Sequence, residues 1–124
     1  MNKRKILCID DDEAVLRLIR LVLERMGEYE VATLSDSQLA MQTIHQFKPE
    51  MIFIDINMPG REGSEIAADI RAERNFSTVP IIFLTGAVSN EEIERSDGKI
   101  GGQLFLAKPI DMERLVGYIK QHLG

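Results

Sequence analysis

The feature that most constrains the fold of this chain is a regular alternation of short apolar runs with amphipathic segments. The apolar runs have the length and the Ile, Val, Leu and Phe content of buried β-strands. They cover residues 5–9, 29–34, 51–54, 79–84 and 104–107. A helix-like segment follows each run, and this order predicts an α/β fold with a five-stranded parallel sheet covered by five helices on its two faces.

Capping and stop signals mark the first three helices. The first ends at Gly27, the second opens at residues 35–38, which fit a capping box, and the third begins at Gly63. The apolar residues that recur at helical spacing in the first helix are Val15, Leu18, Ile19, Val22, Leu23 and Met26.

The last two helices differ in strength. Residues 89–92 form a second capping box, but Gly98, Gly101 and Gly102 follow closely, so the fourth helix is expected to be short. Asp111 is positioned to cap the last helix.

Size and charge limit the class of protein. The 124 residues suit a single domain over residues 1–124, and no apolar run approaches the ~20 residues of a membrane span. The net charge of −5 argues against a broad nucleic-acid surface. The N-terminal residues lack the apolar core of a signal peptide, and the single Cys8, in an apolar run, predicts a buried thiol. We therefore expect a cytoplasmic protein.

Reactive side chains stand at the ends of four of the five predicted strands. The first strand ends at Asp10 and Asp11, the third at Asp55, the fourth at Thr85 and the fifth at Lys108. Each alone would be an ordinary turn or surface residue. Parallel sheets, however, bind ligands at the carboxyl ends of their strands, so four such ends together indicate a functional site.

The acids at these ends predict a cation site. If the strand order is 2-1-3-4-5, Asp10, Asp11 and Asp55 converge on one crevice, where their mutual repulsion requires a cation. Oxygen ligands favour a hard divalent ion such as Mg²⁺. With Thr85 and Lys108 able to hold phosphoryl oxygens beside it, Asp55 has the surroundings of a nucleophile for phosphoryl transfer.

Taken as a set, these motifs resemble those of a response-regulator receiver domain, the phosphoacceptor module of bacterial two-component signalling. The resemblance runs from about Lys5 to Leu123 and implies a flavodoxin-like, doubly wound sheet with strand order 2-1-3-4-5. The residues that carry it are Ile9–Asp11, Asp55–Pro59 with Gly63, Thr85–Ala87 and Lys108–Pro109.

The resemblance also implies roles for single residues. Asp55 would accept a phosphoryl group from a sensor histidine kinase or a histidine phosphotransfer protein. Asp10 and Asp11, with Asp55 and the backbone carbonyl of Asn57, would bind Mg²⁺. The phosphoryl group would be held by Thr85 and Lys108.

The implied output is a conformational switch. Phe105 matches the family's aromatic switch residue, which turns inward as Thr85 moves and so changes the face formed by the fourth strand, fourth helix and fifth strand. Many relatives have Tyr where this chain has Phe105, and residues 96–103 lack the usual Gly-Ala pattern. The protein would be a signalling switch rather than an enzyme, catalysing only its own phosphoryl uptake and aspartyl-phosphate hydrolysis.

Three rival functions are weaker. A phosphohydrolase with an aspartyl-phosphate intermediate needs an acid where Asn57 stands, and a nucleotide-binding protein needs a glycine-rich loop where residues 10–12 are acidic. An interaction module that kept only the fold would not need the complete set of acids, Thr and Lys. The kinase, the output pathway, a monomeric or weakly dimeric state, and a stand-alone or excised domain stay open.

Overall fold

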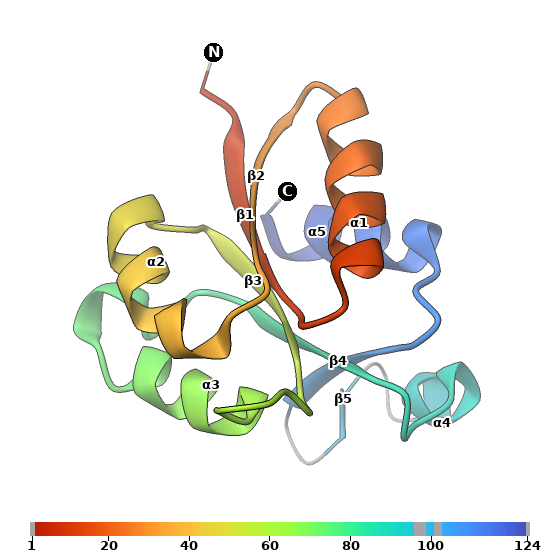
Figure 1. Ribbon diagram of the computed structural model, residues 1–124. Coiled ribbons are helices and arrows are strands. Elements are labelled where there is room, and N and C mark those ends of the chain that lie inside the picture. The colour runs from red at the N-terminus through yellow and green to blue at the C-terminus, as the bar shows by residue number, and fades with distance from the viewer. Residues whose placement is uncertain (1, 96–98, 101–102, 124) are drawn as a thin grey trace.

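The computed structural model describes residues 2–95, 99–100 and 103–123. Helices and parallel strands alternate along the chain, as the sequence predicts (Figure 1). The strands are β1 (Arg4–Ile9), β2 (Tyr29–Leu34), β3 (Met51–Asp55), β4 (Ile81–Thr85), β5 (Lys99–Ile100) and β6 (Gln103–Ala107). The helices are α1 (Glu13–Arg25), α2 (Ala40–Phe47), α3 (Gly63–Arg71), α4 (Asn90–Arg95) and α5 (Met112–Leu123), with 3₁₀ turns η1 (Ser37–Leu39) and η2 (Arg74–Phe76).

The sheet has the order β2-β1-β3-β4-β6-β5. Its first five strands are parallel, and β6 is the fifth strand expected from the sequence, so the predicted order 2-1-3-4-5 is confirmed. The sequence did not predict β5, a two-residue strand antiparallel to β6 at the sheet edge.

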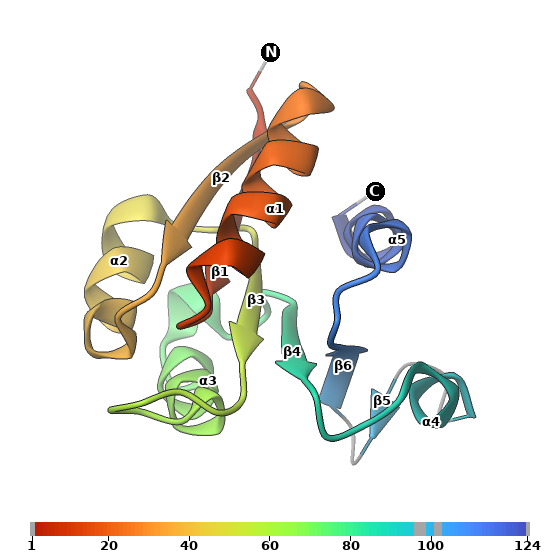
Figure 2. The ribbon, with the colours of Figure 1, turned by 45° about the vertical axis from the view of Figure 1, so that its right-hand side comes forward.

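Two apolar layers enclose the sheet because alternate residues of each strand face opposite sides. Met51 and Phe53 of β3 pack toward α1 and α5, whereas Ile52 and Ile54 pack toward α2 and α3. The two pairs of helices lie on opposite faces (Figure 2). Cys8 lies in the α1–α5 layer, which confirms the predicted buried thiol, and burial raises the pKa of this thiol to about 12.

The first helix buries only some of the apolar residues that recur at helical spacing in the sequence. Its buried residues are Leu16, Ile19 and Leu23, while Leu18 is 44% exposed. The apolar residues of α1 spread over more of the helix surface than the part that contacts the sheet. Helical spacing alone therefore did not identify which of these residues are buried.

Side-chain caps place the helix starts. Asp12 accepts hydrogen bonds from the backbone N–H groups of Ala14 and Val15, and Asp111 caps α5 in the same way. In the second helical region the cap is Asp36, which begins a 3₁₀ turn, rather than the expected box that opens at Ser35.

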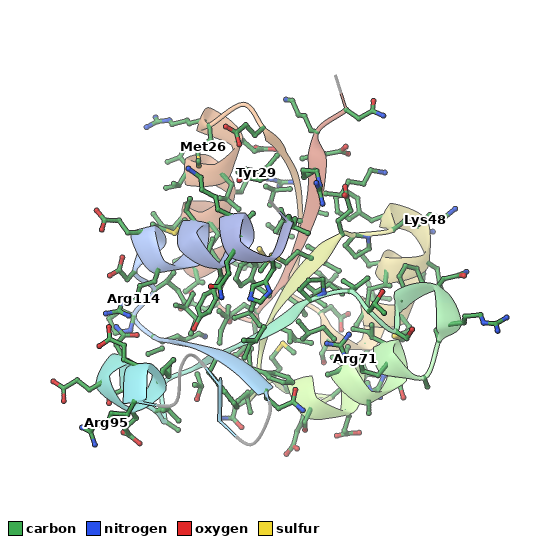
Figure 3. All side chains as sticks on the ribbon, turned by 180° about the vertical axis from the view of Figure 1, so that it is seen from behind. Met26, Tyr29, Lys48, Arg71, Arg95 and Arg114 are labelled. Carbon is green, nitrogen blue, oxygen red and sulfur yellow. The ribbon has the colours of Figure 1, made fainter. Side chains whose placement is uncertain are left out.

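The fourth helix is short, as predicted. It has six residues, begins with the capping box between Ser89 and Glu92, and buries Ile93. Gly98, Gly101 and Gly102, from which its length was predicted, lie outside the described residues. Arg114 of α5 forms an ion pair with Glu94, and Figure 3 shows Arg114 between α5 and α4.

Candidate functional site

The predicted site residues meet at the carboxyl edge of the sheet. Asp10 directly follows β1, Asp55 is the last residue of β3, and these two strands are neighbours. Asp10 continues the alternation of Ile6 and Cys8, and Asp55 that of Met51 and Phe53, so both acids turn toward the α1–α5 side of the sheet. Lys108, two residues beyond Leu106, follows the same alternation.

An ion-pair network joins the first, third and last of these strands. The ammonium nitrogen Nζ of Lys108 lies 2.7 Å from Oδ2 of Asp10 and 3.5 Å from Oδ2 of Asp55. Asp10 is completely buried and Asp55 is 6% exposed. The second oxygen of Asp10 accepts the backbone N–H of Asp12 at 2.9 Å, which fixes the orientation of that carboxylate.

These surroundings change the acidity of Asp55. Burial, followed by the negative charge of Asp10, raises the pKa of Asp55 to about 6, against the opposing effect of Lys108. Burial lowers the pKa of Lys108, but its interactions with Asp10 and Asp55 outweigh burial, and the net direction is upward. The site therefore keeps its ammonium charged and holds more negative charge than one Lys can neutralise.

The acidic cluster (Asp10, Asp11 and Asp55) fits a divalent cation. One carboxylate oxygen from each residue can be chosen so that all three lie within 4.8 Å of one another. Three carboxylates and one ammonium leave two uncompensated negative charges. The donors are all oxygen, and Asp11 is exposed, so hydrated cations can reach the cluster. Mg²⁺ suits this donor set because it retains several waters and uses few carboxylates.

The loop after β3 is closed tightly at its base. The backbone N–H of Gly63 donates to the carbonyl of Ile56 at 2.8 Å, and that of Asn57 donates to Oδ1 of Asp55 at 3.4 Å. A Cβ at Gly63 would lie 2.3 Å from the carbonyl oxygen of Asp55, so only glycine fits there. Asn57 is thus held beside Asp55, whereas the metal role of its carbonyl stays a prediction.

Thr85, the last residue of β4, and Phe105, in the middle of β6, belong to the neighbouring pair of strands. Thr85 is buried, and its hydroxyl accepts the backbone N–H of Ala87 at 3.0 Å. Thr85 continues the alternation of Ile81 and Phe83, which face the α2–α3 side. Its carbonyl accepts the backbone N–H of Lys108 at 2.8 Å, which connects Thr85 to the ion-pair network. The Lys108-Pro109 peptide bond that follows is cis.

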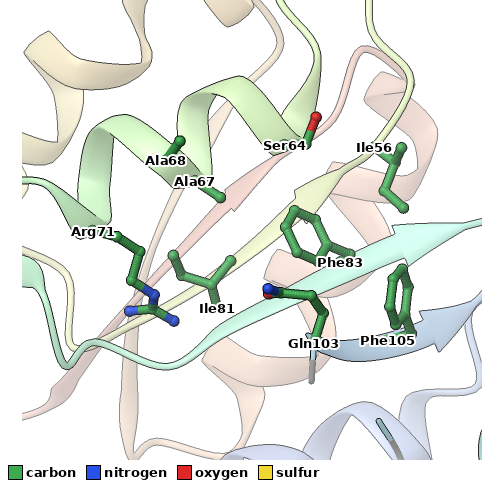
Figure 4. A pocket seen from close by; sticks show the side chains of 9 residues that line it. All are labelled: Ile56, Ser64, Ala67, Ala68, Arg71, Ile81, Phe83, Gln103 and Phe105. Carbon is green, nitrogen blue, oxygen red and sulfur yellow. The ribbon is translucent and has the colours of Figure 1, made fainter. Parts of the chain in front are cut away.

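Phe105 is half-buried beside a groove on the α2–α3 side. Its ring centroid lies 5.6 Å from that of Phe83, and the hydroxyl of Tyr118 donates to its carbonyl. Figure 4 shows both rings at one end of the groove and Arg71 at the other. The groove has a volume of about 310 Å³ and is lined by Ile56, Ser64, Ala67, Ala68, Arg71, Ile81, Phe83, Gln103 and Phe105.

One buried residue near the site was missed by sequence reasoning. Ser37 is 2% exposed and contacts the loop that carries Asn57. In the sequence it was interpreted only as part of a helix cap. Its contact partners lie more than twenty residues away, so no local pattern could have identified it.

The comparisons with known proteins agree with this geometry. A family model described as "Response regulator receiver domain" matches residues 6–120. The chain is 37% identical over 119 residues to the nisin biosynthesis regulatory protein NisR of Lactococcus lactis subsp. lactis, covering 96% of this chain and 50% of NisR. It is 35% identical over 124 residues to the sensor protein GacS of Pseudomonas syringae pv. syringae, covering 97% of this chain and 13% of GacS. The chain therefore spans half or less of the length of these curated relatives.

Solved structures of response regulators have the same fold as this chain. The chemotaxis protein CheY4 of Vibrio cholerae superposes with a TM-score of 0.81 at 28% identity, covering 98% of this chain and 99% of that one. A two-component response regulator from Clostridium difficile superposes with a TM-score of 0.79 at 26% identity, covering 98% and 96%.

Proposed function

Because the chain belongs to the response regulator receiver domain family, we propose that Asp55 is its phosphoacceptor and that the reaction depends on Mg²⁺. Phosphorylation of an aspartate by a partner is the general function of this family. The observation that carries the assignment to Asp55 is its position: it ends the fully buried strand β3, belongs to the acidic cluster and lies 3.5 Å from Nζ of Lys108.

The side chains account for the transfer as follows. An oxygen of the ionised Asp55 attacks the phosphorus of the donor, the new O–P bond forms, and the bond from phosphorus to the donor's imidazole nitrogen breaks. At pH 7–8 most Asp55 is ionised, because its raised pKa is still only about 6. Lys108 moves its ion pair from the carboxylates to the phosphoryl oxygens, and the Thr85 hydroxyl hydrogen-bonds one of them. When bound by Asp10, Asp11, Asp55 and the carbonyl of Asn57, Mg²⁺ supplies positive charge for the phosphoryl oxygens.

The partner in this proposal is a sensor histidine kinase or a histidine phosphotransfer protein. Beside Lys108 lies an open hollow of about 510 Å³, lined mainly by apolar side chains that include Leu18, Pro109 and Ile110. Exposed apolar surface next to a reactive group is suited to docking a partner. The exposed Leu18, one of the apolar residues at helical spacing in α1, would contact such a partner.

The response is a shift of the face formed by β4, α4 and β6. Thr85 would move toward the phosphoryl group, and Phe105 would turn into the space thus freed. The coupling is supported by the bond between the Thr85 carbonyl and the Lys108 backbone N–H. A cytoplasmic location and a single-domain chain are part of the same proposal.

Phosphodonor labelling tests the acceptor. We expect the protein, incubated with Mg²⁺ and acetyl phosphate, to gain one hydroxylamine-sensitive phosphoryl group that mass spectrometry locates at Asp55. Asp55→Asn should lose the label completely. Asp36→Asn, at an exposed acid that caps η1, should keep it. Label on another residue, or none on the wild-type chain, would refute the proposal.

Metal titration tests the acidic cluster. We expect Asp11→Asn to weaken Mg²⁺ binding at least tenfold by calorimetry while the protein stays folded, because the Asp11 side chain is exposed. Asp12→Asn is the matched control, since asparagine also caps helices. Equal Mg²⁺ affinity in the Asp11 variant and the wild type would count against the cluster.

A further inference from the structure

The buried polar residues suggest a further member of the site. Among the described residues, four polar or charged side chains are buried: Asp10, Ser37, Asp55 and Thr85. Three of them belong to the proposed site already. The fourth, Ser37, lies in η1, between β2 and α2. Apolar packing in the core does not explain why this polar side chain is buried.

Ser37 fastens the tip of the loop that follows β3. Its hydroxyl donates to the carbonyl of Pro59 at 2.7 Å and accepts the backbone N–H of Arg61 at 3.1 Å. Between these two residues Gly60 has φ +89°, and a Cβ there would lie 3.1 Å from the Ser37 hydroxyl oxygen. The positive φ favours glycine at this position, and the tip of the loop lies close against η1.

The same loop is fixed at its base by the Gly63–Ile56 bond, and Met58 is buried in the α2–α3 layer. Asn57 stands between these anchors. Without the Ser37 bonds, the tip would lose its two hydrogen bonds to η1, and on its C-terminal side the backbone at Asn57 would be held by the burial of Met58 without them.

We infer that Ser37 is a positioning residue that holds the loop backbone for the cation and makes the site selective for Mg²⁺ over Ca²⁺. This inference rests on the proposed function, in which the Asn57 carbonyl is a ligand. Mg²⁺ demands a near-ideal octahedron with ligands at about 2.0–2.1 Å, whereas Ca²⁺ accepts flexible geometry at about 2.3–2.6 Å. A carbonyl held in one place favours the smaller ion, and a loosened loop removes that preference.

The test compares two serines of one segment. Ser37→Ala removes both bonds, and Ser35→Ala, at an exposed serine two residues away, is the control. We expect Ser37→Ala to weaken Mg²⁺ binding roughly fivefold and Ca²⁺ binding by less than about twofold, as measured by calorimetry with each ion alone. Ser37→Thr, which keeps a hydroxyl, should restore at least part of the preference for Mg²⁺.

A purely structural serine would give a different result. If Ser37→Ala lowers both affinities by the same factor, or neither, the positioning role is refuted while Asp55 labelling can still succeed. If the wild type binds Mg²⁺ but takes no label, the phosphoacceptor proposal fails and the selectivity measurement still decides the role of Ser37. A wild-type chain that binds no Mg²⁺ would overturn both.

Discussion

The two sides of the sheet's carboxyl edge are built differently. At the β1–β3 side, every residue of β3 is buried, and backbone bonds close the loop that follows it. At the β4–α4–β6 side, the first three residues of β6 are exposed or half-buried, and α4 has a single buried residue, Ile93. Covalent chemistry needs fixed groups, whereas a response needs a region that can rearrange at low cost. In the proposed function, these two requirements fall to neighbouring pairs of strands.

The largest expected contrast lies between two glycines, one on each side. Alanine at Gly63 would place its Cβ against the backbone of Asp55 and Ile56, whereas alanine at Gly86, after β4, would meet nothing within 4 Å. We expect Gly63→Ala to lower the free energy of unfolding by roughly 2–4 kcal/mol and Gly86→Ala to change it by less than about 0.5 kcal/mol. Urea unfolding followed by circular dichroism measures both. Equal changes would mean that the two sides are packed alike.

A smaller effect is expected from charge at the β1–β3 side. Because the pKa of Asp55 is raised in the folded state, ionisation of this carboxyl group destabilises the fold. The destabilisation is complete above about pH 6. Asp55→Asn should therefore stabilise the metal-free protein by roughly 1–2 kcal/mol at pH 8, and the gain should vanish as the pH falls toward about 4.

Thermal and urea unfolding across this pH range, with Asp36→Asn as the control, test the charge effect. Saturating Mg²⁺ should reduce the gain at pH 8, because the cation compensates the ionised Asp55. A gain that is constant with pH, or larger at pH 4, would contradict the assigned cause.

The smallest expected effect concerns the β4–α4–β6 side. Arg114 pairs with Glu94 and with Asp111, and thereby ties α4 to α5. We expect Arg114→Gln to speed amide hydrogen exchange in α4 without changing the loop after β3, because the pairs are exposed and local. Hydrogen-exchange mass spectrometry resolves the two segments. Faster exchange in both α4 and the loop after β3 would contradict the contrast between the two sides, because it would show that they are coupled in the resting protein.

The sequence predicted the β1–β3 side well for a physical reason. A strand covered on both faces needs a continuous apolar run, and its end is marked where a carboxylate follows, as at Asp10 and Asp55. The five parallel strands could be obtained in this way, whereas their order, and with it the convergence of the acids, was implied by the resemblance to receiver domains.

The other features have no local pattern. A two-residue strand such as β5 is too short to show a period, and the exposure of Leu18 depends on which part of α1 meets the sheet. Ser37 is recognisable only from its contacts with Pro59 and Arg61 across the fold. These features depend on contacts between residues that are far apart in the sequence, so no local sequence pattern indicates them.

The ion pairs of Lys108 have a consequence for the stage of synthesis at which the site can form. The acids follow β1 and β3, while their ammonium partner follows β6, the last strand of the sheet. The ribosome synthesises the chain from its N-terminus, so Asp10 and Asp55 emerge before Lys108. A nascent chain thus displays Asp10 and Asp55 before the Lys108 ammonium that pairs with both of them has been synthesised.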